Sequence, residues 1–274
     1  MLNDNYVIFE ILGVKHNDFG NSFVFTKDAV CEISNDQFIR KVIVSADISN
    51  ATIYLHNSLE ITDETSSQIV NYLYQYLGSM MISLLKNSSQ YSSVSLKPTI
   101  RLSAIHFSEK DNTKIVLDEY IQLRDSMAIQ HTFDRGDDIL EKWIQDVDVP
   151  NYTSKNDKYD ILFLLLQGEN TVQKYMAMYA YLLSLVKEIY LKPKEGQKQV
   201  VQYVTDNCSR VGIKLFLSQS TRPGAKPTDK EDQFTSLRNK IGHPSVTNSP
   251  VNVSENAVNG LASIICCAIE DIPS

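Results

Sequence analysis

Residues 231–244, EDQFTSLRNKIGHP, decide how the second half of this 274-residue chain is interpreted. Three apolar side chains recur there at i, i+3 and i+7, which is the spacing of the apolar face of a helix. These residues are Phe234, Leu237 and Ile241. Gly242 and Pro244 follow them, and both residue types are typical of a helix end. The stretch therefore predicts a short helix whose other faces are polar.

The start of this helix is predicted from a capping box. Thr228 and Glu231 stand three residues apart, so each side chain can accept a hydrogen bond from the backbone N–H of the other residue. On this pattern the helix is expected to begin near Asp229.

Three polar residues lie outside the apolar face, namely Arg238, Asn239 and His243. Asn239 and His243 are four residues apart and share a helix face. Arg238 points elsewhere, but its side chain is long enough to converge with His243 at the helix end. Because the apolar face already accounts for packing, we expect these residues to serve chemistry. An imidazole that moves a proton beside a permanent guanidinium suits phosphodiester cleavage.

The run Arg-Asn-Lys-Ile-Gly-His at residues 238–243 resembles the RxxxxH signature of the HEPN superfamily. The fuller pattern Glu-Asp-x-x-Thr-x-Leu-Arg-Asn-x-x-x-His, which ends at His243, is similar to that of the MauJ-like and ApeA-like branches. The resemblance covers residues 157–271. It implies an all-α HEPN-like helical bundle that forms a homodimer, with the two motifs facing each other in a cleft.

The resemblance also implies an activity. Active members of the superfamily are metal-independent endoribonucleases that typically leave a 2′,3′-cyclic phosphate, and such proteins often act in phage defence or as toxins. Carried over by position, Arg238 would bind and polarise the phosphate, His243 would be the acid and base, and Asn239 would orient them. The expectation is an enzyme without a metal and without a cofactor.

Other functions agree with the same residues. One is a non-catalytic protein whose bundle dimerises and whose amino-terminal module recognises a protein or a small molecule. A second is an accessory factor in amine utilisation, which rests on the MauJ-like name alone. A structural explanation also exists, in which Arg238 pairs with Glu231 or Asp232 and His243 caps the helix.

Charge is distributed unevenly along the chain. The formal net charge of −7 excludes a chain-wide nucleic-acid-coating protein. Residues 192–230, however, hold eight Lys and Arg against three Asp and Glu, and such a segment could follow an RNA backbone. The candidate RNA-binding residues are Lys214, Arg222, Lys226 and Lys240. The alternative is a basic loop that only faces water.

Apolar residues recur at helical spacing through most of residues 150–274, on both sides of the motif. A loop is expected over 209–230. Helices are expected over 158–191 (with a break at Gly168), 197–208 and 254–271. Four tyrosines of the longest segment could stack on bases, but helical spacing favours packing in the core. They are Tyr175, Tyr179, Tyr181 and Tyr190.

Residues 1–149 have a different pattern, with short β-rich runs around a helix that begins after Thr62. Strands are expected over 6–12, 22–26, 30–33, 41–48, 52–55, 95–107 and 114–123, and a short helix over 137–145. A polar linker is expected over 149–156. The predicted fold class is an α+β module over 1–149, whose ligand no motif identifies, followed by the all-α HEPN-like bundle over 150–274.

The compartment is expected to be the cytoplasm. Acidic Asp4 and Glu10 accompany the first apolar run, which excludes a signal peptide, and no apolar window is suited to spanning a bilayer. The four cysteines lack metal-ligand spacing and indicate buried thiols in a reducing compartment. No membrane partner is expected.

Overall fold

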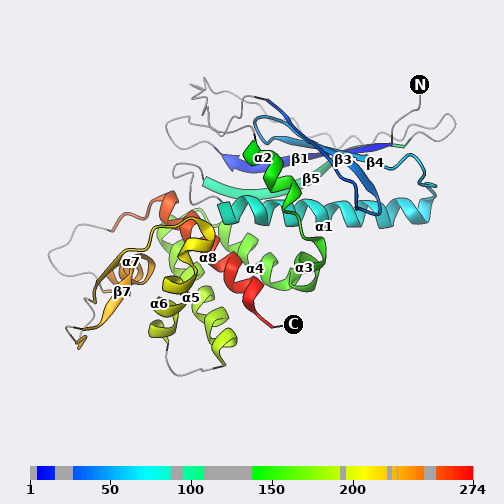
Figure 1. The fold of residues 1–274 in the computed structure, drawn as a ribbon. Coiled ribbons are helices and arrows are strands. Elements are labelled where there is room, and N and C mark those ends of the chain that lie inside the picture. Colours follow the sequence, from blue (N-terminus) through cyan, green and yellow to red (C-terminus); the bar gives the residue numbers. More distant parts are fainter. Residues whose placement is uncertain are drawn as a thin grey trace, which may run out of the picture. The chain divides into compact units, whose positions relative to one another are not determined.

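The structure, a computed structural model, describes residues 5–15, 27–87, 95–107, 138–191, 196–220, 224–226, 228–243 and 251–273. These residues form two compact units (Figure 1). The first unit takes its described residues from Met1–Ser83 and Val94–Val149, and the second from Leu84–Ser93 and Pro150–Ser274. The first contains an antiparallel sheet and the second is mostly helical, so the chain is α+β followed by helices.

The sheet of the first unit has five antiparallel strands in the order β2-β3-β4-β1-β5. The strands are β1 (Tyr6–Lys15), β2 (Ala29–Glu32), β3 (Ile39–Val44), β4 (Asn50–Leu55) and β5 (Ser95–His106). Alternate residues of β1 are buried, as in Val7 and Phe9, because successive side chains of a strand point to opposite faces. Val7 is paired with Ile53 on one side and with Ile105 on the other.

Five of the predicted strands are confirmed, with boundaries that differ by a few residues. The one expected over 41–48 ends at Val44, because a tight turn follows it. In that turn Ile48 has a positive φ of 55°, and Asp47 accepts a 3.0 Å hydrogen bond from the backbone N–H of Ser49. The strands predicted over 22–26 and 114–123 lie outside the described residues.

Helix α1 (Asp63–Asn87) lies between β4 and β5 in the chain, and Thr62 caps its amino terminus as predicted. In the first unit α1 packs on the sheet, where Tyr74 meets the ring of Phe9 edge-on at 5.2 Å. The predicted short helix is confirmed as α2 (Asp138–Gln145). The hydroxyl of Tyr76 donates to the carbonyl of Ile144 at 3.2 Å, which fixes the end of α2 on α1.

The predicted polar linker over 149–156 is wrong, because these residues begin two helices. They are α3 (Val149–Ser154) and α4 (Asn156–Leu166). A proline is tolerated in the first turn of a helix, where its missing N–H would have no partner, and Pro150 stands there in α3. Tyr152 is buried and stacks on Tyr159 with ring centroids 5.4 Å apart. The packing of these two aromatic rings therefore stabilises helices in a segment whose other residues are mostly polar.

The other helices of the second unit agree with the predicted periodicity. They are α5 (Thr171–Tyr190), α6 (Gln197–Asn207), α7 (Gln233–Gly242) and α8 (Glu255–Asp271), with a short 3-10 turn η2 (Cys208–Val211) after α6. Helix α8 is buried almost all round from Val258 to Ile269 and contacts α4, α5 and α6. It is the centre of this unit. No helix in the described part of the chain is long and apolar enough to cross a bilayer.

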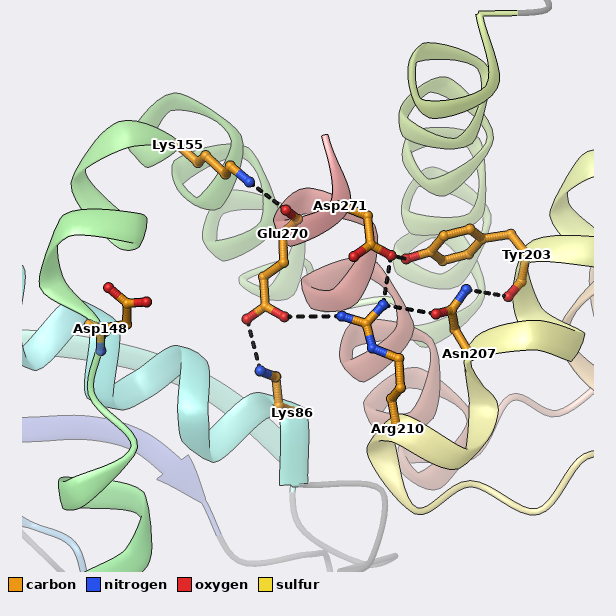
Figure 2. Close-up of polar contacts among 9 residues, drawn as sticks. Lys86, Asp148, Lys155, Tyr203, Asn207, Arg210, Glu270 and Asp271 are labelled. Atoms are coloured by element: carbon orange, nitrogen blue, oxygen red, sulfur yellow. Dashed lines mark hydrogen bonds and ion pairs between the residues drawn. The ribbon is translucent and has the colours of Figure 1, made fainter. Parts of the chain in front are cut away.

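The carboxyl end of α8 is held by a polar network (Figure 2). Glu270 accepts a 2.8 Å hydrogen bond from the Lys86 ammonium, and its backbone carbonyl accepts one of 2.5 Å from Lys155. Cations are favoured at this point because the carbonyl end of a helix carries partial negative charge. The two lysines therefore stabilise the end of the central helix.

Asp271 is the second acid of this network. It accepts a 2.7 Å hydrogen bond from Arg210 of η2 and a 2.6 Å bond from the Tyr203 hydroxyl (Figure 2). Partial burial alone would raise the pKa of Asp271, but these two hydrogen bonds outweigh it and lower the pKa. Asp271 is therefore held as a carboxylate that joins α6, η2 and α8.

Candidate functional site

The helix that carries the motif begins later than predicted. Residues 230–232 form strand β7 (Lys230–Asp232), which pairs with β6 (Leu217–Gln219) in a small antiparallel hairpin. Helix α7 starts at Gln233, and the predicted Thr228 capping box is wrong. The loop expected over 209–230 is likewise corrected, because η2 forms at its start, β6 lies within it and β7 begins at its last residue. Strand pairing removes Glu231 from the helix and moves the cap to Asp232.

Asp232 caps α7 from a buried position. One carboxylate oxygen accepts the backbone N–H groups of Phe234 at 2.8 Å and Thr235 at 3.0 Å, and the other accepts the Thr235 hydroxyl at 2.6 Å. Burial raises the pKa of Asp232, although the hydrogen bonds from Thr235 and Phe234 oppose the shift. The first turn of α7 is thereby fixed by one side chain.

Helix α5 supports the same turn. The Tyr175 hydroxyl donates to the carbonyl of Phe234 at 3.0 Å, and the Tyr179 hydroxyl lies 2.8 Å from that of Thr235. Both tyrosines are buried, as the helical spacing predicted. Burial raises the pKa of Tyr179 strongly, so this hydroxyl is neutral and serves packing and hydrogen bonding. These two tyrosines are not available to stack on a base.

Asn239 lies at the centre of a second network. Its side-chain oxygen accepts hydrogen bonds from Arg238 Nη1 at 2.9 Å and from Gln197 Nε2 at 3.0 Å. Its amide nitrogen donates to Glu231 Oε1 at 2.8 Å. Asn239 is only 3% exposed, so the expectation that it is not needed for packing is wrong. Its amide joins α6, β7 and α7, and it also orients Arg238.

Arg238 is half-buried, and its guanidinium lies along the last turn of α7. The guanidinium approaches Gly242, where an added Cβ atom would lie 3.8 Å from Nη1. Within the described ranges, its one side-chain hydrogen bond is to Asn239, and no ion pair joins it to Glu231 or Asp232. A guanidinium has five N–H donors, and among the described residues a side-chain hydrogen bond engages Nη1 of Arg238, through Asn239.

His243 is the residue at which α7 ends. Its backbone N–H donates to the carbonyl of Asn239 at 2.9 Å, and its φ and ψ of −133° and 66° are no longer helical. The residue is exposed. It directly follows Gly242, against which the Arg238 guanidinium lies. The structure therefore brings a guanidinium and an exposed imidazole to the same end of one helix.

The predicted RNA-binding lysines are all exposed, as a phosphate contact requires. Lys240 is on α7, Lys226 lies before β7, and Lys214 lies before β6 with its ammonium 5.3 Å from the Phe216 ring centroid. Arg222, the fourth candidate, lies outside the described residues. No described contact joins these lysines to the Arg238–Asn239 pair.

A small cavity lies beside the Asn239 network. Its volume is about 210 Å³, and its walls include Gln197, Lys198, Ser220, Lys230, Glu231 and Thr235. Sequence reasoning assigned Glu231 to a helix cap and so missed it as a lining residue. The acidic residue at the start of the motif was the available signal, but only the hairpin of β6 and β7 places this residue in the wall of a cavity.

The chain was compared with known protein families, proteins and structures. No family model matches the chain, and comparisons with curated proteins and with solved structures found no match. Among the described residues, no group of three or more His, Cys, Asp or Glu side chains is placed to hold a metal ion. The candidate site consists of Arg238, Asn239 and His243 on α7 and at its end, with the neighbouring cavity that Glu231 helps to line.

Proposed function

We propose that this protein is a metal-independent endoribonuclease of HEPN type, a cytoplasmic homodimer that acts in phage defence or as a toxin. The observation that carries the proposal is the pairing at the end of α7. The Arg238 guanidinium is oriented by Asn239 and has no carboxylate partner in the described chain. It lies beside Gly242, and the next residue is His243, which is exposed.

The proposed reaction is transesterification of RNA. His243 takes the proton of a 2′-hydroxyl, the 2′-oxygen forms a bond to phosphorus, and the bond from phosphorus to the 5′-oxygen breaks. A protonated His243, supplied by the second copy in the homodimer, gives its proton to the leaving 5′-oxygen. The products are a 2′,3′-cyclic phosphate and a 5′-hydroxyl.

Arg238 is assigned to the phosphate in this reaction. Its planar guanidinium presents paired N–H donors to two non-bridging oxygens, which suits the extra charge of the pentacoordinate transition state. Asn239 is a positioning residue, because it holds the guanidinium from a buried amide. Lys214, Lys226 and Lys240 are proposed to contact the phosphates of the flanking RNA.

The experiment is cleavage of mixed RNA by the full chain in the presence of EDTA. We expect fragments that end in a cyclic phosphate, and we expect Arg238→Ala and His243→Ala each to abolish them. His106→Ala is the matched control, because this histidine stacks on Tyr6 in the first unit and should leave cleavage unchanged. Circular dichroism must show that all variants are folded. Cleavage that persists in both motif variants would contradict the proposal.

A non-catalytic binding protein is the second candidate, and one observation favours it. The buried amide of Asn239 links Gln197, Glu231 and Arg238, which explains these motif residues as parts of the fold. This candidate includes an accessory role in amine utilisation. It predicts a folded dimer that leaves RNA intact, with Arg238→Ala lowering stability and no nuclease activity in any variant.

A further inference from the structure

Strand β6 leaves one edge of its hairpin open. In the described chain β6 pairs with β7 on one side, and the sheet that they form has two strands. The hairpin lies beside α7 at the margin of the second unit (Figure 1). Leu217, Ser218 and Gln219, which make up β6, are all exposed. An edge strand presents backbone N–H and C=O groups with which a further strand can pair.

The register of the hairpin shows which backbone groups face the open edge. In an antiparallel pair, residues that exchange both backbone hydrogen bonds alternate with residues that exchange none. The N–H of Ser220 donates to the carbonyl of Asp229 at 2.8 Å. Ser218, two residues earlier and paired with β7, therefore also bonds to that strand. Leu217 and Gln219 alternate with these serines, so their N–H and C=O groups point away from β7 to the open edge.

The side chains at this edge are apolar and exposed. Phe216 is 58% exposed and Leu217 is 45% exposed. They lie on opposite faces of the hairpin, because successive side chains of an extended chain alternate. Residues 215–219, Leu-Phe-Leu-Ser-Gln, include no charged residue and no proline, although these are the residues with which proteins commonly protect an open edge. An unprotected apolar edge indicates an interface.

We propose that β6 pairs antiparallel with β6 of a second copy of this chain, so that the two hairpins form one four-stranded sheet. The two-fold axis passes beside Leu217, which faces Leu217 of the second copy. These two leucines exchange both backbone hydrogen bonds, and Gln219 exchanges both with Leu215 of the second copy. The inference deepens the proposed function and rests on it for the homodimer, because it names the surface through which the second copy docks.

The edge is complementary to itself in this register. Phe216 faces Ser218 of the second copy on both sides of the axis, so a large side chain meets a small one. The ammonium of Lys214 lies 5.3 Å from the Phe216 ring centroid, and this lysine faces Ser220 of the second copy. No like charges therefore stand opposite each other. Pairing also extends a two-stranded hairpin, which is marginally stable by itself, to a larger sheet.

Sedimentation velocity of the full chain without RNA tests the interface over a series of protein concentrations. We expect the wild-type protein to form a dimer. Leu217→Lys and Leu217→Glu should each be monomeric, because each variant places like charges opposite each other across the axis. An equimolar mixture of the two variants should recover the dimer, since opposite charges then face each other. Leu164→Lys is the matched control, because this leucine is 72% exposed on α4 and its replacement should leave the dimer intact.

Hydrogen exchange gives a second measurement. The amides of Leu217 and Gln219 should exchange more slowly in the dimer than in the monomeric variants, whereas the amides of Ser218 and Ser220 already bond to β7 and should change less. Circular dichroism must show that every variant is folded. A wild-type protein that stays monomeric would overturn the proposal and leave the edge to a strand of a different protein. A dimer that survives in both Leu217 variants, or a mixture that stays monomeric, would also overturn it.

The proposed nuclease and the β6 interface can fail separately, because sedimentation is measured without RNA. A dimer that depends on Leu217 in a protein that leaves RNA intact would refute only the nuclease. Cleavage of RNA by a protein whose dimer survives both Leu217 variants would refute only the β6 interface.

Discussion

Arg238 donates a 2.9 Å hydrogen bond to Asn239, its immediate neighbour in the chain. Consecutive helical residues point about 100° apart, so the long arginine side chain must fold back to reach the buried amide. One N–H group is used in this contact, and the guanidinium then lies along Gly242. The pair connects an exposed helix end with the interior of the second unit.

Asn239→Ala is expected to destabilise the protein by about 1–3 kcal/mol. The change removes the donor to Glu231 Oε1 and the acceptor for Gln197, which leaves buried polar atoms without partners. Urea unfolding followed by circular dichroism measures the loss. Lys240→Ala, at the exposed next position, is the control and should change stability by less than about 0.5 kcal/mol. Equal effects of the two changes would contradict the Asn239 network.

Two of the helix caps in the second unit, Asp232 and Ser254, should differ in strength. Asp232→Ala removes the acceptor for two backbone N–H groups and a hydroxyl in a buried site, and should cost about 2–3 kcal/mol. Ser254→Ala removes the exposed cap of α8 and should cost about 1 kcal/mol. Thermal unfolding of both variants gives the comparison. A larger loss for Ser254→Ala would show that the Asp232 cap is not the stronger one.

Two glycines should respond in opposite directions to alanine. At Gly260 an added Cβ would lie 3.2 Å from the buried ring of Phe234, so Gly260→Ala should lose about 1–2 kcal/mol through overpacking. At Gly242 the nearest atom is 3.8 Å away, so Gly242→Ala should gain up to about 1 kcal/mol from helix propensity. Denaturant unfolding of the two variants measures both effects, from the shift of the midpoint at an unchanged dependence of the unfolding free energy on denaturant concentration. Stabilisation by Gly260→Ala would mean that α8 does not pack tightly on Phe234.

Asp271 should contribute to the loss of stability in acid. Its pKa is lower in the folded protein than in the unfolded chain, so its contribution is complete above the unfolded pKa and is lost as the pH falls through the folded pKa. Asp271→Asn should cost about 1 kcal/mol at neutral pH, since the pair with Arg210 is partly exposed and screened.

Unfolding free energies between pH 2 and pH 7 are the measurement for Asp271. The difference between the wild-type protein and Asp271→Asn should disappear at the acid end of this range. Asp206→Asn is the control, because this carboxylate is exposed on α6 and, among the described residues, accepts hydrogen bonds from Gln202 of the same helix alone. A gap between Asp271→Asn and the wild-type protein that persists at the lowest pH would contradict the assigned shift.

The long helices were predictable because their signal is local. Apolar residues at helical spacing identified α5 and α8, and α8 begins directly after Ser254, which caps it. The strands of the first unit were predictable for the same reason, since alternation is visible within a few residues. The linker predicted over 149–156 was wrong because the stacking of Tyr152 on Tyr159, which stabilises the helices there, is a tertiary contact that the local polar sequence does not reveal.

The sequence by itself determined the order of strands first and helices later, and it placed the polar residues Arg238, Asn239 and His243 near the end of one short helix. Only the tertiary structure decided how these residues are used. Pairing of β6 with β7 moved the helix start to Gln233 and placed Glu231 in a strand at the wall of a cavity. Gln197, which is 42 residues from Asn239, helped to bury its amide. Periodicity acts between near neighbours, whereas burial and hydrogen-bond satisfaction depend on segments that are distant in the chain.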